Sequence, residues 1–312
     1  MIFLDTNVLP RMGSLKNVLM SAVLKVATHS GLRIYVCDVV VEEAVNIRKE
    51  LASEAIQKLQ DAFNQASKLL ELESIYIPDL HEVTEAWREE LTSTFEVVPV
   101  GGIQAVEALK REAARKRPAR EGKGARDSAI WLSMLDFADG RADPIHFVSD
   151  NKDDFADTSD AKRLHPDLIE DCEARSIEVV YHRNLDSLLE TLSQKVATAP
   201  SGERIEAATS LLHESLFAAS LPQEISDQFH SGRGFLIDVA VSGVRKVKSY
   251  RVGDAVLSLV ALSLEVDTEL ADEVNPPKVP LIVECRAWVE TDANTGTVAT
   301  INVEEITALS ER

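Results

Sequence analysis

The chain begins MIFLDTN at residues 1–7, and this stretch decides the predicted fold. Ile2, Phe3 and Leu4 are apolar and suit a buried strand, whereas the carboxylate of Asp5 follows them at once. An unpaired buried charge is costly, so the strand is expected to end at Asp5. In an open parallel sheet the carboxyl ends of the strands border the crevice that binds ligands. Asp5 is therefore expected at such a crevice, and other acids that follow strands are candidates to join it.

Strand patterns alternate with helical patterns up to residue 195. Further short strands are expected at 32–36, 145–149 and 177–181, where β-branched and aromatic residues gather. The stretches between them carry apolar residues at three- and four-residue steps, as in the long helical pattern at 42–72. Alternating strands and helices are typical of a parallel α/β sheet. An α/β domain is therefore predicted over residues 1–197.

The pattern changes after the stretch TAPSG at 198–202, which is typical of a linker. One helix is predicted at 203–218, and β-rich runs follow it. These runs lie at 235–241, 244–252, 255–266, 280–290 and 297–303. Polar and apolar residues alternate along 281–290, as expected for a sheet with one face in water. A separate, smaller α+β domain is predicted over residues 203–312.

The composition narrows the classes of function. The formal net charge is −19, which disfavours a broad nucleic-acid surface because phosphate binding needs cations. Three cysteines lie far apart and the histidines are scattered, so neither a disulfide framework nor a zinc site is indicated. No apolar run is long enough for a membrane span, and no signal-peptide pattern is present. A soluble, cytoplasmic protein with no membrane partner is expected.

Four acids share a position at the end of a strand or at the start of a helix beside one. They are Asp5, Glu43, Asp127 and Asp150. Clustered carboxylates repel one another unless a cation neutralises them, and ligation by oxygen alone suits Mg²⁺ or Mn²⁺. Such an ion can activate water and stabilise charge on a scissile phosphate. Taken alone, Glu43 could complement a helix dipole and Asp150 could sit in a turn, whereas Asp5 has no glycine or proline beside it to favour a turn. The inference depends on the set and its order.

These acids lie in four motifs, which occur in a fixed order along the chain. The motifs are LDTNVL at 4–9, VVVEE at 39–43, GARDSAIW at 124–131 and FVSDNKDDF at 147–155. Together they resemble the PIN-domain nucleases, and among these the larger bacterial branch whose last motif reads T-x-N-x-x-D-F. The resemblance covers residues 1–195.

The resemblance implies a Rossmann-like α/β/α sandwich with a parallel sheet, acting as a hydrolase. Its members cleave phosphodiester bonds of RNA, usually single-stranded, with Mg²⁺ or Mn²⁺ as the cofactor. Asp5 matches the first acid of the family, Glu43 the second and Asp127 the third. Glu42 is the alternative for the second acid, but Glu43 fits the spacing of the family better.

The fourth acid departs from the usual motif. An acid usually stands two residues after the Ser/Thr, and this chain has Asn151 there. Either Asp150 or Asp154 could substitute for it. Both are candidate metal ligands, and Asp150 is also a candidate catalytic residue. Other polar residues match positions that support the acids in the family; these are Thr6, Asn7, Ser149 and Asn151.

A basic segment at 110–126 contrasts with the acidic chain, with eight lysines and arginines against two glutamates. Alone, such a cluster is most simply a solvated helix face. Beside an acidic nuclease site it has a second interpretation, because it ends one residue before Asp127. Arg120, Lys123 and Arg126 are therefore candidates to contact the phosphates of an RNA substrate.

Three functions stay open from the sequence. The first is a metal-dependent ribonuclease, with the toxin of a toxin–antitoxin pair as one possible role and an antitoxin as its partner. The second is a catalytically degenerate PIN-like scaffold that acts through its C-terminal domain and binds a protein or forms a homo-oligomer. The third is a small-molecule phosphohydrolase, which is disfavoured because neither GxGxxG nor GxxxxGK[ST] occurs at a strand–helix turn.

Overall fold

The computed structural model describes residues 1–15, 17–70, 76–197, 199–219, 221, 225, 234–270 and 278–311. The chain forms two compact units. The first comprises Met1–Leu15 and Ser30–Leu188, and the second comprises Lys16–His29 and Leu189–Arg312. The helix α1 (Val18–His29) thus belongs with the C-terminal sequence, which the predicted division of the chain at residues 197–203 does not anticipate.

The first unit is built on a five-stranded parallel sheet of order β3-β2-β1-β4-β5. Its strands are β1 (Ile2–Leu4), β2 (Ile34–Cys37), β3 (Glu96–Val98), β4 (Ile145–Val148) and β5 (Val179–His182). The sequence patterns predict four of them; β3 escapes because only one of its three residues is buried. The strand order reverses between β1 and β4, so a topological switch point lies at their carboxyl ends. The predicted α/β fold is confirmed.

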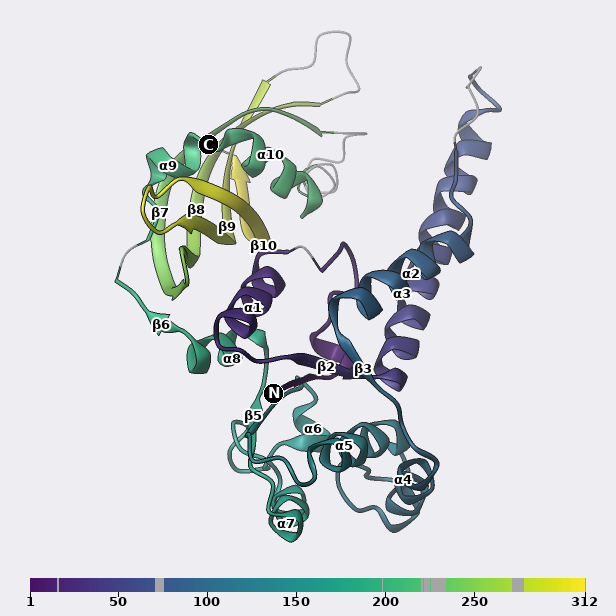
Figure 1. The fold of residues 1–312 in the computed structure, drawn as a ribbon. Coiled ribbons are helices and arrows are strands. Elements are labelled where there is room, and N and C mark those ends of the chain that lie inside the picture. The colour runs from purple at the N-terminus through teal and green to yellow at the C-terminus, as the bar shows by residue number, and fades with distance from the viewer. Residues whose placement is uncertain are drawn as a thin grey trace. The chain divides into compact units, whose positions relative to one another are not determined.

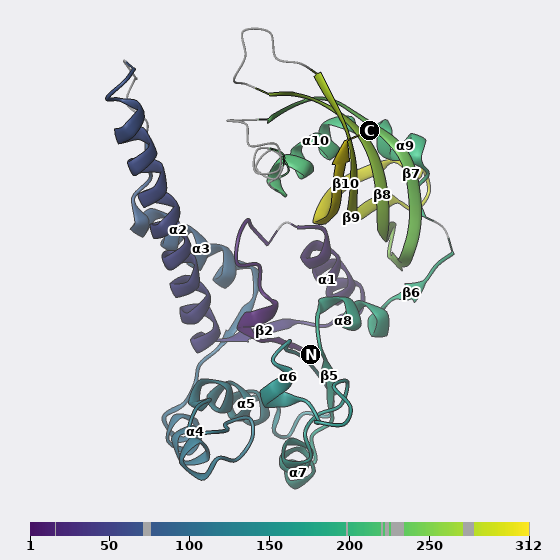
Figure 2. The same cartoon turned by 180° about the vertical axis from the view of Figure 1, so that it is seen from behind.

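Helices flank this sheet. They are the 3-10 helix η1 (Thr6–Val8), α2 (Asp38–Ala66), α3 (Leu80–Thr94), α4 (Gly102–Ala114), α5 (Ala125–Ala138), α6 (Lys152–Phe155) and α7 (Pro166–Arg175). Figure 1 shows α2 and α3 running side by side as an arm that leaves the sheet. Figure 2 shows α4, α5 and α7 together beside the parallel strands. None of the helices in the described part of the chain is long and apolar enough to cross a membrane.

The aromatic core of the first unit holds α5 on the sheet. Phe3 stacks on Tyr35 with ring centroids 5.2 Å apart, and Trp131 of α5 meets the edge of Phe147 at 5.8 Å. Trp131 is fully buried. Residues four apart lie on the same helix face, so the burial of Trp131 also turns Asp127 toward the sheet. The packing of α5 therefore determines the orientation of a candidate site residue.

The second unit contains a five-stranded antiparallel sheet of order β10-β9-β8-β7-β6. The strands are β6 (Gln194–Lys195), β7 (Gly234–Val252), β8 (Ala255–Leu270), β9 (Lys278–Asp292) and β10 (Val298–Glu311). The two runs predicted at 235–241 and 244–252 belong to the single strand β7. A shift in register between Val241 and Gly243 interrupts the alternation of side chains there, so the sequence pattern shows two runs. The predicted α+β class of this part is confirmed.

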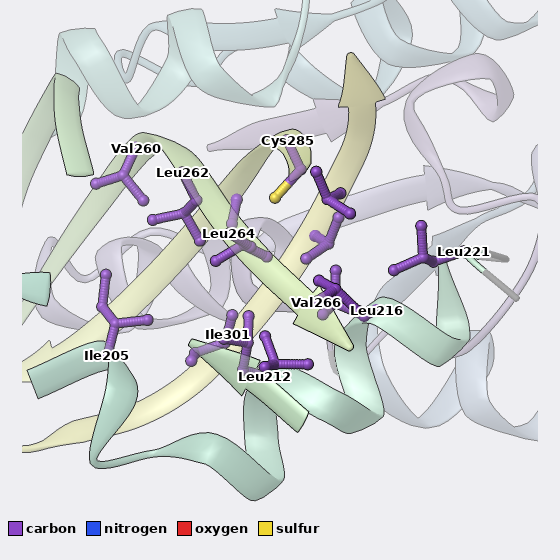
Figure 3. Packing of buried hydrophobic residues seen from close by; sticks show 14 of the residues in the cluster. Ile205, Leu212, Leu216, Leu221, Val260, Leu262, Leu264, Val266, Cys285 and Ile301 are labelled. Atoms are coloured by element: carbon purple, nitrogen blue, oxygen red, sulfur yellow. The ribbon is translucent and has the colours of Figure 1, made fainter. Parts of the chain in front are cut away.

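Two short helices pack on one face of this antiparallel sheet. They are α9 (Gly202–Glu206) and α10 (Thr209–Ala218), where the sequence pattern predicts one helix, and α8 (Leu185–Leu192) precedes them across the boundary of the two units. Figure 3 shows Leu212 and Leu216 of α10 packed against Leu264 and Val266 of β8. Alternate residues of β8 and β9 supply this apolar face, as the period-two pattern predicts.

The opposite face of the sheet is only partly in water, contrary to the prediction for 281–290. Arg286 is exposed, but Trp288 and Glu290 are buried. The helix α1 contacts β7, β9 and β10, and its Lys25 forms an ion pair with Glu290. The prediction fails at this end because the sequence pattern does not show that α1, distant in the chain, covers it.

Candidate functional site

Asp5 leaves β1 at the topological switch point, where it caps the helix η1. Its carboxylate is buried and accepts three hydrogen bonds. The Thr6 amide donates to Oδ1 at 2.8 Å, while Ser149 Oγ and Asn7 Nδ2 donate to Oδ2 at 2.6 and 3.0 Å. These donors replace water around the buried charge and hold the carboxylate in one orientation.

Asn7 and Ser149 join the ends of β1 and β4. Asn7 Oδ1 accepts the Asp150 amide at 2.9 Å, and Asn7 Nδ2 also lies 3.3 Å from Ser149 Oγ. Ser149 is fully buried, and its carbonyl accepts the Tyr181 hydroxyl at 2.9 Å. The DTN stretch therefore has three distinct tasks. Asp5 is the acid, Asn7 ties the two strand ends, and Thr6 contacts the next acid.

Glu43 is the acid that Thr6 contacts. Thr6 Oγ1 donates to Glu43 Oε2 at 2.8 Å. The helix α2 begins directly after β2, so Glu43 lies close to the end of that strand. The neighbouring Glu42 instead pairs with Arg88 of α3, and its side chain is 66% exposed against 23% for Glu43. Of the two sequence candidates, Glu43 is the one beside Asp5.

Asp127 lies in the first turn of α5 and is partly buried. Burial, together with the negative charges of Asp5, Asp154 and Glu43, raises the pKa of its carboxyl to about 7. Burial likewise raises the pKa of Asp5 to about 6, although the hydrogen bonds from Ser149 and Thr6 oppose this. The charges of Asp5, Glu43 and Asp154 thus all lie close enough to act on Asp127. Asp5 and Asp127, the inner pair of the four acids, resist carrying charge.

Asp154, rather than Asp150, approaches the other acids. Asp154 Oδ2 accepts Asn151 Nδ2 at 2.8 Å, and its side chain is only 18% exposed. Asp150 is 58% exposed and pairs with Arg183 at 2.6 Å. Asn151, which stands where the family motif usually has an acid, therefore positions the acid three residues later.

The basic segment divides into two parts in the structure. Arg111 and Lys116 belong to a structural network away from the four acids, in which both contact Asp171. The second part contacts the site itself. Arg126 pairs with Glu43, and Arg120 Nε lies 2.9 Å from Asp154 Oδ1.

Arg117 and Lys123 complete this second part. Arg117 lies 3.8 Å from Asp154 Oδ1 and donates to the Asp153 carbonyl. Lys123 is exposed in the turn that follows Arg120. Of the three residues predicted to contact phosphate, Arg120 and Arg126 thus pair with acids of the site, and Lys123 faces solvent.

A tight turn and a glycine shape the segment before α5. Arg120 and Lys123 exchange two backbone hydrogen bonds of 2.9 Å around Glu121 and Gly122, which both have positive φ as a type I′ turn requires. Gly124 follows with φ +103°, and a Cβ there would lie 2.9 Å from Ala119 Cα. Gly124 therefore allows the close approach that brings the arginines and Asp127 to one place.

The donor set fits a hard divalent cation. Asp5, Glu43, Asp127 and Asp154 offer only carboxylate oxygen, the ligand that Mg²⁺ and Mn²⁺ prefer. Burial, and to a lesser extent repulsion between the acids, raises the pKa values of Asp5 and Asp127, and a cation would offset both effects. As arranged in the described parts of the chain, however, no three His, Cys, Asp or Glu side chains form a group that could hold a metal. The outer acids, Glu43 and Asp154, are instead bound to arginines.

Sequence reasoning missed two residues at this edge of the sheet. Arg117 contacts the loop that carries Asp154, and no sequence signal separates it from the other cations of its segment. Arg183 pairs with Asp150, and its position directly after β5 was a usable signal, because it is the strand-end position that identified the acids.

Comparison with known families agrees with this geometry. A family model described as a PIN domain matches residues 2–155. No match was found among curated proteins or among solved structures. The matched region contains all four acids and the strands that carry them, while the particular bacterial branch of the family is not identified. PIN domains are generally nucleases that act on nucleic acid and typically depend on divalent metal. Residues 2–155 of this chain are therefore identified as a PIN domain.

Proposed function

We propose that this chain is a Mg²⁺- or Mn²⁺-dependent endoribonuclease that hydrolyses single-stranded RNA. The observation that supports it best is the pair of desolvated carboxylates, Asp5 and Asp127, at the switch point of a PIN-domain sheet. Maintaining two such acids without a full set of partners costs stability. A site that binds a cation explains why the fold keeps them.

The metal would be held by Asp5, Glu43, Asp127 and Asp154. When bound, it would supply a Lewis acid for the scissile phosphate and lower the pKa of water. The protein would contribute orientation. Ser149 and Asn7 fix the carboxylate of Asp5, Thr6 fixes Glu43, and Asn151 fixes Asp154. This assignment replaces Asp150 with Asp154 as the fourth acid.

Arg120, Lys123 and Arg126 would contact the RNA backbone. Such contacts fix the register of the substrate and carry no base information. A cytoplasmic location, a cognate antitoxin and a homo-oligomer are all compatible with the proposal, and none of them is required for it.

The alternative is a PIN-like scaffold without catalytic activity. One observation favours it, namely that Asn151 stands where the family motif usually has an acid. Under this alternative the chain would bind partners through its C-terminal unit, and the state of the acids would not affect that binding.

The decisive experiment combines Mn²⁺ titration by calorimetry with cleavage of a mixed-sequence single-stranded RNA. It uses wild type, Asp5→Asn, Asp127→Asn and Glu43→Gln, with Glu42→Gln as the matched control. The three site variants should lose metal binding and at least about 100-fold of the cleavage rate, as when a transition-state charge stabiliser is removed. Glu42→Gln should behave like wild type, because Glu42 faces Arg88. A wild-type protein that neither binds Mn²⁺ nor cleaves RNA would overturn the proposal in favour of the scaffold.

A further inference from the structure

Arginines of one short segment bind the two outer acids of the candidate site. Arg126 pairs with Glu43 of α2, and Arg120 pairs with Asp154 of α6. Arg117 supports the second contact through the Asp153 carbonyl. The two acids come from widely separated parts of the chain, and residues 117–126 reach both. We name Arg120 and Arg126 the arginine clasp.

Each outer acid divides its two oxygens in the same way. Glu43 Oε2 accepts the neutral Thr6 hydroxyl, while Oε1 contacts Arg126. Asp154 Oδ2 accepts the neutral amide of Asn151, while Oδ1 contacts Arg120. A cation that approaches the arginine-bound oxygen meets a like charge, so metal and guanidinium compete for the same position.

The clasp residues are free to leave. The side chain of Arg126 is 67% exposed and that of Arg120 is 41% exposed. Exposed ion pairs contribute little to stability, so exchange of partners is inexpensive. Arg111 differs, because its side chain is 9% exposed and holds Asp171 through two hydrogen bonds. The clasp can therefore change partner without disturbing the core, whereas Arg111 cannot.

We infer that Arg120 and Arg126 are exchangeable counter-ions of the metal site. In the metal-free protein they neutralise Asp154 and Glu43. The divalent cation displaces them, and the released guanidinium groups then bind phosphates of the RNA backbone. This inference rests on the proposed function, and it makes RNA affinity depend on metal occupancy.

The first test measures Mn²⁺ affinity by calorimetry for wild type, Arg120→Gln, Arg126→Gln and the double variant. Arg115→Gln is the control, because it removes the same charge from an exposed position of the same segment. Loss of each clasp arginine should tighten Mn²⁺ binding about two- to fivefold, the range expected for an exposed ion pair. Arg115→Gln should bind Mn²⁺ like wild type. An unchanged or weaker affinity in the clasp variants would overturn the inference.

The second test measures binding of single-stranded RNA as a function of salt, in chelator and in Ca²⁺. Release of two arginines should steepen the slope of log K against log salt by about 1.4, at 0.7 per phosphate contact. The double variant should show no such steepening. Equal slopes for wild type in the two conditions would overturn the inference.

The two failures are distinguishable. If wild type binds Mn²⁺ and cleaves RNA but the clasp variants bind Mn²⁺ no more tightly, the inference about the clasp is wrong and the proposed nuclease function is retained. If wild type binds no Mn²⁺ and cleaves nothing, both fail, and the arginine contacts are permanent structural ion pairs.

Discussion

The parallel-sheet unit contains two partly buried clusters of charged residues, one around Asp171 and one at the candidate site, that differ in how fully their negative charge is neutralised. At the structural cluster, burial would raise the pKa of Asp171, but hydrogen bonds and charge from Arg111, with Trp131 and Lys116, hold it below its usual range. At the candidate site the pKa values of Asp5 and Asp127 are raised to about 6 and about 7. The charge of Asp171 is neutralised within the protein. At the candidate site the arginines pair with Glu43 and Asp154 and leave Asp5 and Asp127 without an ion pair among the described residues.

The difference teaches how to separate a structural acid from a functional one. Both clusters are partly buried, and both draw on cations of the same basic segment. Arg111 is buried and bidentate at Asp171, whereas Arg120 and Arg126 are exposed and reach only the outer acids. Burial of an acid alone is therefore uninformative, and the completeness of its partners decides between the two roles.

The largest expected effect is on stability, and it has opposite signs at the two clusters. Asp171→Asn leaves Arg111 buried without its partner and should destabilise the protein by about 3–5 kcal/mol. Asp127→Asn removes a desolvated charge and should stabilise the metal-free protein at pH 8 by up to about 4 kcal/mol, because its pKa is raised from 3.8 to about 7 and each unit corresponds to about 1.4 kcal/mol.

Urea unfolding in chelator measures both variants of this pair. Cleavage activity provides the second readout, because Asp171→Asn should keep the activity of its folded fraction while Asp127→Asn loses it. A destabilised Asp127→Asn would show that Asp127 is a structural acid like Asp171.

The second effect is a pH dependence of the metal-free protein. Asp5 and Asp127 have raised pKa values in the folded state, so the folded chain holds protons that the unfolded chain releases above pH 3.8. Their stabilising contribution is therefore fully present below this value and is lost as pH rises through about 6 and 7. Asp171 has a lowered pKa, so its contribution is lost as pH falls.

Measuring the free energy of unfolding in chelator from pH 4 to pH 8 tests the predicted direction of this pH dependence. Stability should decline by a few kcal/mol across the range, and the decline should shrink in Asp127→Asn. Saturating Mn²⁺ should also reduce it, because metal binding favours the ionised acids. A decline of the same size in Asp127→Asn would contradict the assignment of the titrating groups.

Much of the site could be predicted from sequence. Asp5, Glu43 and Asp127 were identifiable because strand ends and helix starts have strong local signals, and four motifs in order restrict the fold. The sequence leaves Asp150 and Asp154 both open as the fourth acid, and the structure is needed to see that Asp154 is the one near Asp127. The helix α6 that orients Asp154 has four residues, too few for a periodic pattern.

Other features depend on contacts between distant parts of the chain. Sequence shows that α1 has an apolar face but not that this helix packs on β7, β9 and β10. The clasp was equally hidden, because arginine side chains have many rotamers and their partners lie 34 and 83 residues away. The basic segment was predicted as a phosphate contact, and the pairing of its members with acids required the structure.

A third effect compares the two candidates for the fourth acid. Asp154→Asn should reduce Mn²⁺ affinity and cleavage about 10- to 100-fold, the range expected when a metal-site residue is lost. Asp150→Asn should change either quantity by less than about threefold, because Asp150 is exposed and its pair with Arg183 is a surface ion pair. Calorimetry and cleavage on the same samples decide. A larger loss of Mn²⁺ affinity and cleavage in Asp150→Asn than in Asp154→Asn would show that Asp150 is the fourth acid.

The smallest expected effect concerns Ser149, one of the three residues that donate a hydrogen bond to the carboxylate of Asp5. Its buried hydroxyl donates to Asp5 Oδ2 at 2.6 Å and lowers the pKa of that carboxyl. Ser149→Ala should raise this pKa and weaken Mn²⁺ binding about fivefold at pH 6, as expected for loss of one hydrogen bond to a charged group. At pH 8 Asp5 is ionised in either protein, so the difference should narrow. Ser133→Ala is the matched control, because its buried hydroxyl has no partner among the described residues. A Ser149→Ala defect that is equal at both pH values would mean that Ser149 acts on the strand ends and not on the ionisation of Asp5.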